Sequence, residues 1–225
     1  MYGDGIGLSG GNAALVPYSR SNADDNSHKA YVREEPDTLS PATKAEVKAR
    51  LHIPASVTDF DDTLDALLEA ATTIVQDWIN RKLKTHGLDL WLDEPPNRDR
   101  VFLPYPPSTA VVTVTTYDPD NTPTEFANTN YIVSIQNDRP KIVLRAGCSW
   151  PTDVRAADAF KFVFSTGYGA DNGDVPQALR EAVRRIAADM YLSPTDWCGK
   201  DSTEIIFDRL PTVGLILNQY ATEKL

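Results

Sequence analysis

Three stretches of the chain place hydrophobic residues on one side of a helix, because these residues recur at positions i, i+3, i+4 and i+7. The stretches cover residues 40–52, 61–82 and 175–191. Ser40 is the expected N-cap of the first helix, with Pro41 in its first turn. Each apolar stripe must be buried against a neighbouring element. The stripe of the second helix comprises Leu64, Leu67, Leu68, Ala71, Val75, Trp78 and Ile79. The stripe of the third helix comprises Val175, Leu179, Ala182, Val183, Ile186, Ala187 and Met190.

Between the second and third helices the pattern changes to alternating and β-branched residues, which indicates strands. Residues 110–117 give the clearest signal, because Val and Thr fill most of their positions. Residues 84–100 are expected to form a loop. The other expected strands cover residues 100–103, 131–135, 141–145 and 160–165, and the middle two of these form a hairpin.

A glycine-rich turn joins the last strand to the third helix. Gly167, Gly169 and Gly173 supply positions where a chain can turn sharply with a positive φ. Asp174 is the expected N-cap of the helix, and Pro176 fits the first turn, where its missing N–H costs no hydrogen bond.

The two ends of the chain differ in composition. Residues 1–36 are rich in Gly, Ser, Asn and Asp, which predicts a flexible tail. The apolar segment 205–220 either folds back on its own domain or docks on another protein, and the sequence leaves both open.

Together these patterns predict an α+β fold. We expect a bundle of three main helices in a core of residues 37–200, and a C-terminal docking tail of residues 201–225. A small antiparallel sheet, at about residues 100–166, is inserted between the second and third helices.

The charge of the chain argues against two classes of partner. Its formal net charge is −10, whereas non-specific binding to nucleic acid or to an anionic membrane needs a surface rich in Lys and Arg. No apolar run approaches the length of a membrane span. Cys148 and Cys198 are expected to be reduced thiols, although a disulfide between them stays open.

We expect no catalytic residue, no cofactor site and no metal site. The three histidines, His28, His52 and His86, lie far apart and in no ligand spacing. Asp61 and Asp62 are adjacent, so they point in different directions from the helix that they begin, where acidic charge is favourable.

Five features follow one another along the chain in an order that is also found in one protein family. They are the helix pair, the Leu103-Pro104-Tyr105-Pro106-Pro107 stretch, the Val-rich strand, the Gly167-Tyr168-Gly169 turn with its Asp174-Val175-Pro176 helix start, and the Leu210-Pro211 tail. This set, over residues 39–220, is similar to the head–tail connector (adaptor) proteins of long-tailed bacteriophages and gene transfer agents, of the HK97 type.

The resemblance implies a structural virion protein that is made in the host cytoplasm and resides in the neck. Such adaptors form a homo-oligomeric ring, usually a dodecamer, between the portal and a stopper or tail-completion protein. Double-stranded DNA passes through the ring without specific binding, and no membrane is involved.

Two sets of residues are candidates for contacts in such an assembly. By resemblance to the family's tail, the portal-binding candidates are Ile205, Ile206, Phe207, Leu210, Pro211, Val213, Leu215, Ile216, Leu217 and Tyr220, and a chain without residues 205–225 is expected to fold but not to bind the portal. The mixed charges of the third helix are the candidates for subunit–subunit ion pairs: Arg180, Glu181, Arg184, Arg185 and Asp189.

Two other functions stay open. A stopper or tail-completion protein would occupy the same neck but tends to be mostly β. An enzyme or a small-molecule binding module would show a deep pocket with convergent titratable groups, for which the sequence offers no pattern.

Overall fold

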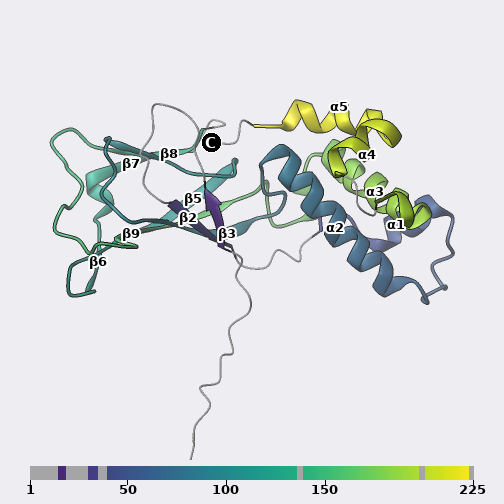
Figure 1. Ribbon diagram of the computed structural model, residues 1–225, viewed down its shortest axis with the longest axis horizontal. Helices are drawn as coiled ribbons and strands as arrows, with labels where there is room; N and C mark the ends of the chain where they lie inside the picture. The colour runs from purple at the N-terminus through teal and green to yellow at the C-terminus, as the bar shows by residue number, and fades with distance from the viewer. Residues whose placement is uncertain (1–14, 19–29, 35–39, 136–138, 198–200, 223–225) are drawn as a thin grey trace, which may run out of the picture.

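The computed structural model of the chain describes residues 15–18, 30–34, 40–135, 139–197 and 201–222. A helical part and a β part lie side by side along the longest axis (Figure 1). The chain forms two strands of the β part, then α1 and α2, then the rest of the β part, and returns to the helices at its C-terminal end. The α+β fold predicted from the sequence is therefore confirmed.

The described residues form five α-helices, and the first three match the predicted stretches. Helices α4 and α5 lie in the C-terminal segment, which folds back on its own domain in this structure. The helices are α1 (Lys44–Leu51), α2 (Asp61–Ile79), α3 (Gln177–Leu192), α4 (Ser202–Arg209) and α5 (Pro211–Tyr220).

One hydrophobic core joins all of these helices. The predicted stripe of α2 is mostly buried, with Leu64, Val75 and Ile79 fully inaccessible to solvent. It packs against the stripe of α3, and Val213 and Leu217 of α5 close the core from a third side. Each fully buried Leu, Ile or Val side chain contributes about 1.5–3 kcal/mol to folding, so this shared core holds the bundle together.

The start of α1 differs from the prediction. Thr43, not Ser40, is the N-cap, because the Thr43 side chain accepts a hydrogen bond from the Glu46 backbone while the Glu46 carboxylate accepts one from the backbone N–H of Thr43. Lys48 of α1 is only 5% exposed, although it is charged. Its ammonium donates to the carbonyl of Val57 at 2.7 Å and pairs with Asp61, which satisfies the buried charge.

The β part consists of two antiparallel sheets. The larger has the strand order β1-β2-β3-β9-β5-β6, and the smaller has the order β4-β8-β7. The strands are β1 (Leu15–Tyr18), β2 (Ala30–Glu34), β3 (His86–Leu92), β4 (Arg100–Phe102), β5 (Ser108–Tyr117), β6 (Pro123–Glu125), β7 (Tyr131–Ser134), β8 (Lys141–Leu144) and β9 (Phe160–Thr166).

The inner faces of the two sheets enclose a second hydrophobic core. Phe160, Phe162 and Phe164 of β9 are fully buried at its centre. Their neighbours come from both sheets and include Leu88 and Ile142. Period-2 alternation in β9, buried at every second residue, places its lysine on the opposite face.

Five strands of the β part were predicted, and four others were not. Strand β3 lies in the segment expected to be a loop, yet it is the partner of β9 over seven residue pairs. Strands β1 and β2 lie within residues 1–36, and β2 pairs with β3. The rest of the predicted tail lies outside the described residues.

The glycine turn connects the two parts of the molecule. Gly167 has a φ of +114°, and a Cβ there would collide with the backbone carbonyl of Lys84, so only glycine fits. The backbone N–H of Tyr168 donates to the Leu83 carbonyl at 3.2 Å, which ties the turn to the end of the α2 region. Asp174 is not the N-cap of α3: it ends a short 3₁₀ turn (η2, Asn172–Asp174). Its carboxylate accepts a hydrogen bond at 3.0 Å from the backbone N–H of Asp171, the N-cap of that turn.

Candidate docking surfaces

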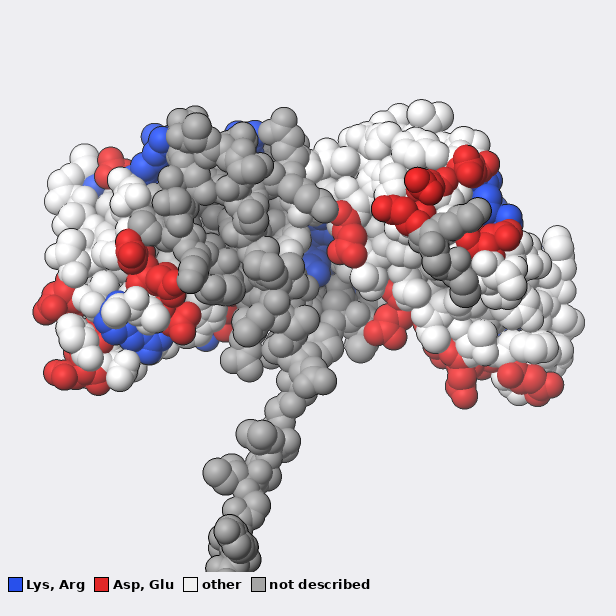
Figure 2. Space-filling model, in the orientation of Figure 1, with Lys and Arg blue, Asp and Glu red and all other residues white. Residues whose placement is uncertain are grey.

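Charged side chains mark the helical part, and acidic ones predominate on the face shown in Figure 2. The charges that the sequence assigned to contacts between copies lie on α3. Their partners, described next, come from α1, from α4 and from the 3₁₀ turn η3 (Pro194–Trp197).

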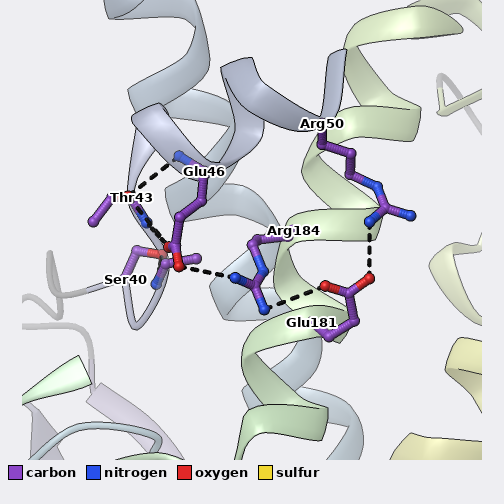
Figure 3. Close-up of polar contacts among 7 residues, drawn as sticks. Ser40, Thr43, Glu46, Arg50, Glu181 and Arg184 are labelled. Atoms are coloured by element: carbon purple, nitrogen blue, oxygen red, sulfur yellow. Dashed lines mark hydrogen bonds and ion pairs between the residues drawn. The ribbon is translucent and has the colours of Figure 1, made fainter. Parts of the chain in front are cut away.

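A network of ion pairs joins α1 to α3 (Figure 3). Arg184 contacts Glu46 at 2.8 Å and Glu181 at 3.2 Å. Glu181 also contacts Arg50 and Arg185, each at 2.8 Å. The two carboxylates therefore fix the position of the short helix α1 on α3.

The pKa values of both carboxyl groups in this network are lowered. Burial alone would raise the pKa of Glu46, but the hydrogen bond from the Thr43 backbone and the charge of Arg184 outweigh it. Burial opposes the shift of Glu181 too, and the hydrogen bond from Arg185 with the nearby Arg50 lowers its pKa. Both groups are therefore ionised in the folded chain at neutral pH.

A second group of charges joins α4 to the end of α3. The Arg209 guanidinium donates to both carboxylate oxygens of Asp189, at 2.8 and 2.9 Å, and to Asp196 at 2.5 Å. Trp197 Nε1 donates to Asp189 at 2.9 Å. Burial raises the pKa of Asp189, but these hydrogen bonds outweigh it, so the net shift is downward.

Four of the five predicted subunit-contact residues are thus engaged within the chain: Glu181, Arg184, Arg185 and Asp189. The fifth, Arg180, is half-buried, and its Nε has no hydrogen-bond partner among the described residues. These charges hold helices of one copy together, and the sequence missed this because their partners lie far away in the chain, Glu46 being 138 residues from Arg184.

The ten predicted portal-binding residues divide into two groups. Ile205, Ile206, Val213 and Leu217 are buried, the last three in the chain's own helical core, so no partner reaches them in this conformation. Phe207 and Leu215 are 47% and 63% exposed. The remaining four, Leu210, Pro211, Ile216 and Tyr220, are exposed or half-buried.

Phe207 of α4 and Asn218 of α5 adjoin α2. The Phe207 ring lies 5.4 Å from the Trp78 ring, centroid to centroid, and Trp78 Nε1 donates to Asn218 at 3.0 Å. A shallow hollow beside Trp78 is lined by Ile74 and by the polar residues Asp77, Ser202 and Thr203. Phe207 and Trp78 therefore form a partly exposed aromatic pair on this side of the bundle.

Two further exposed apolar residues were not predicted. Leu192, the last residue of α3, is 69% exposed, and Phe60, which precedes α2, is 42% exposed. Phe60 contacts Tyr191 edge to face, with 5.9 Å between ring centroids. Leu192 could have been found from the sequence, because it lies off the apolar stripe and directly before Ser193 and Pro194.

The residues with possible chemistry do not converge. His52 is exposed at the end of α1, His86 is buried in β3, and His28 lies outside the described residues. In the part of the chain that the structure describes, no three His, Cys, Asp or Glu side chains are placed to hold a metal ion, and no helix is long and apolar enough to cross a membrane. Cys148 is a half-buried free thiol, and Cys198 lies outside the described residues.

Comparison with known proteins identifies the family. The sequence model of the head completion protein (HCP) family matches residues 42–182, which span α1, α2, most of the β part and the first turns of α3. The chain belongs to this family. No curated protein matches the chain.

Solved structures share the fold of this head completion family member. A chain in the neck of an empty gene transfer agent particle, computed with C6 symmetry, superposes with a TM-score of 0.70 at 22% sequence identity, over 86% of this chain and 96% of that chain. A chain in the virion of a native gene transfer agent gives 0.69 at 21%, and one in the neck of a native particle, computed with C12 symmetry, gives 0.66 at 20%, with the same coverage. The family and the fold confirm the predicted resemblance to head–tail connector proteins.

Proposed function

We propose that this chain is a head-to-tail adaptor: copies of it form a ring beneath the portal, join the portal to the stopper or tail, and surround the path of the DNA. The observation that carries the proposal is its membership of the head completion protein family. The fold shared with chains of gene transfer agent necks, where sixfold and twelvefold symmetry apply, supports a ring.

The balance of elements favours an adaptor over a stopper. A stopper is expected to be mostly β, whereas here α2 and α3 form the longest elements and organise a separate helical core. The role proposed is structural, since the proposed function needs stable contacts between copies and neighbours rather than turnover.

We assign the portal contact to the exposed apolar residues of α4 and α5. Leu215 is 63% exposed, and Phe207, 47% exposed, packs on Trp78 of α2. Burying an apolar side chain that is exposed on a helix removes its surface from water, which contributes favourable free energy to binding. The deletion of residues 205–225 is not a clean test, because it would also remove Ile206, Val213 and Leu217 from the core.

A point substitution tests this contact. Leu215→Ser is expected to weaken binding to the purified portal protein by about tenfold or more while leaving the melting temperature within about 1 °C, because the side chain is exposed in the free chain. Leu192→Ser is the matched control, since Leu192 is equally exposed on α3 and is not among the candidates. Equal portal affinities for wild type and Leu215→Ser would overturn the assignment.

A further inference from the structure

The outer face of the small sheet combines apolar and basic residues. Directly opposite residues on neighbouring antiparallel strands share a face, so the register places Arg100 of β4, Val143 of β8 and Ile132 of β7 in one row. The next row on this face contains Phe102 of β4, which is half-buried, Lys141 and Ser134. The alternate residues Val101 and Ile142 point into the core, which confirms that this row faces outward.

Part of this face is open to solvent. Ile132 is 48% exposed, and Val143 is half-buried. Arg100 is exposed and Lys141 half-buried, and neither forms an ion pair with another residue of the described ranges. A chain with a net charge of −10 thus keeps an apolar and basic face in solvent.

Helix α2 is acidic, so its charge is opposite to that of the basic residues on the sheet face. Its sequence contains five acidic residues and neither Lys nor Arg. Asp62, Ala66, Glu69 and Thr73 recur at i, i+4, i+7 and i+11, so they form one exposed stripe. The Asp62 and Glu69 carboxylates form no ion pair with any described residue.

A hollow lies beside this acidic stripe. Its volume is about 530 Å³, and it is open to solvent between the start of α1 and the side of α2. Ala42, Ala66 and Leu68 supply apolar lining. Lys44 also lines the hollow and pairs with Asp65 at 2.7 Å, whereas Glu69 stands at the border without an ion pair to a described residue. The hollow therefore suits an apolar side chain that arrives together with a basic one.

We propose that the outer face of the small sheet in one copy packs on the exposed stripe of α2 in the next copy of the ring. Ile132 enters the hollow, while Arg100 and Lys141 pair with Glu69 and Asp62. This contact rests on the proposed ring. Basic side chains appear near β7 and β8 at the upper side of the view in Figure 2, and acidic ones along the lower side of the bundle, where α2 lies. Faces on different sides of a molecule give the head-to-tail contact that a closed ring requires.

The chemistry of the face favours a second copy over DNA. Phosphate recognition relies on many Lys and Arg side chains and gains nothing from an exposed isoleucine beside them. A protein face that offers both an apolar hollow and unpaired carboxylates matches both features of the sheet.

Charge reversal on each side, and then on both, tests the contact. Reversing the sheet (Arg100→Glu with Lys141→Glu) or α2 (Asp62→Lys with Glu69→Lys) is expected to weaken self-association of the full chain by about tenfold or more, because like charges then meet. All four substitutions together restore opposite charges across the contact, so we expect the ring to recover. Native mass spectrometry of the chain, alone and bound to the portal, measures the ring.

A charge change at positions outside both faces serves as the control for the charge-reversal variants. Asp120→Lys with Asp153→Lys makes the same change of charge as the α2 variant at two exposed positions away from either face, and is expected to leave the ring intact. Rings of unchanged stability in both double variants would overturn this contact but leave the proposed function standing. A wild-type chain that forms no ring, alone or on the portal, would overturn both. If the sheet variant keeps its ring but loses binding to double-stranded DNA, the face belongs to DNA, and the contact proposed here is wrong.

Discussion

Single side chains connect elements of this molecule that are distant in sequence. Asp189 of α3 receives hydrogen bonds from Trp197 and from Arg209 of α4, and its side chain is only 14% exposed. A carboxylate in this position stabilises the fold only while it is ionised, because protonation removes the charge that Arg209 pairs with. The docking of α4 on α3 therefore depends on one ionised group.

This predicts a dependence of stability on pH. Since the pKa of Asp189 is lowered from 3.8 by folding, its contribution is fully present above about pH 4 and is lost as the pH falls through the folded-state pKa. Asp189→Asn is expected to lower the free energy of unfolding by about 2 kcal/mol at pH 7. Urea unfolding at several pH values checks this: the difference from wild type should shrink below pH 4, and a difference that is constant with pH would contradict the argument.

At the scale of elements, one side of α5 is buried and the opposite side is exposed. Leu217 is fully buried in the helical core, whereas Leu215, two residues earlier, is 63% exposed. Val213 and Gly214 lie on the buried side, where the ring of Phe207 contacts Gly214 closely. The helix therefore completes the core with one side and exposes the other to solvent.

A pair of substitutions separates these sides. Leu217→Ala leaves a cavity and is expected to cost about 3 kcal/mol of stability, while Leu215→Ala should change stability by less than about 0.5 kcal/mol. Chemical denaturation of the two variants measures both values. Similar stabilities for the two would show that α5 is not packed on α2 and α3 in solution.

The elements that the sequence predicted are those with strong periodicity. The stripes of α2 and α3 and the alternation of β9 depend only on local spacing, so their positions were found to within a few residues. Strand β3 was missed, although Leu88, Leu90 and Leu92 alternate, because polar and proline-rich residues follow directly. Strands β1 and β2 gave no signal, since their places depend on pairing: β2 pairs with β3, and β1 pairs with β2.

The contacts of the candidate surfaces were less accessible to prediction. The charges of α3 gave a mixed face in the sequence, but which partners they meet depends on tertiary packing that brings Arg50 and Glu46 to Glu181 and Arg184. The apolar C-terminal segment was identified correctly as apolar. Its division into buried and exposed residues required the positions of α4 and α5, because two short helices leave little periodicity to interpret.

At the scale of the whole molecule, two cores meet at the glycine turn. The backbone N–H of Thr85 donates to the carbonyl of Gly169 at 2.8 Å, and Gly167 donates to Pro107, so the turn holds both the end of the bundle and the edge of the sheets. A subunit built this way presents a sheet face and a helix face in a fixed relation. That is the property which a ring of identical copies needs.

The most direct test is electron cryo-microscopy of particles assembled with this chain. The account predicts a neck in which density matching this fold repeats around the particle axis, with α4 and α5 toward the portal and the small sheet of each copy on α2 of the next. Particles with a complete neck in which this fold is absent would contradict it.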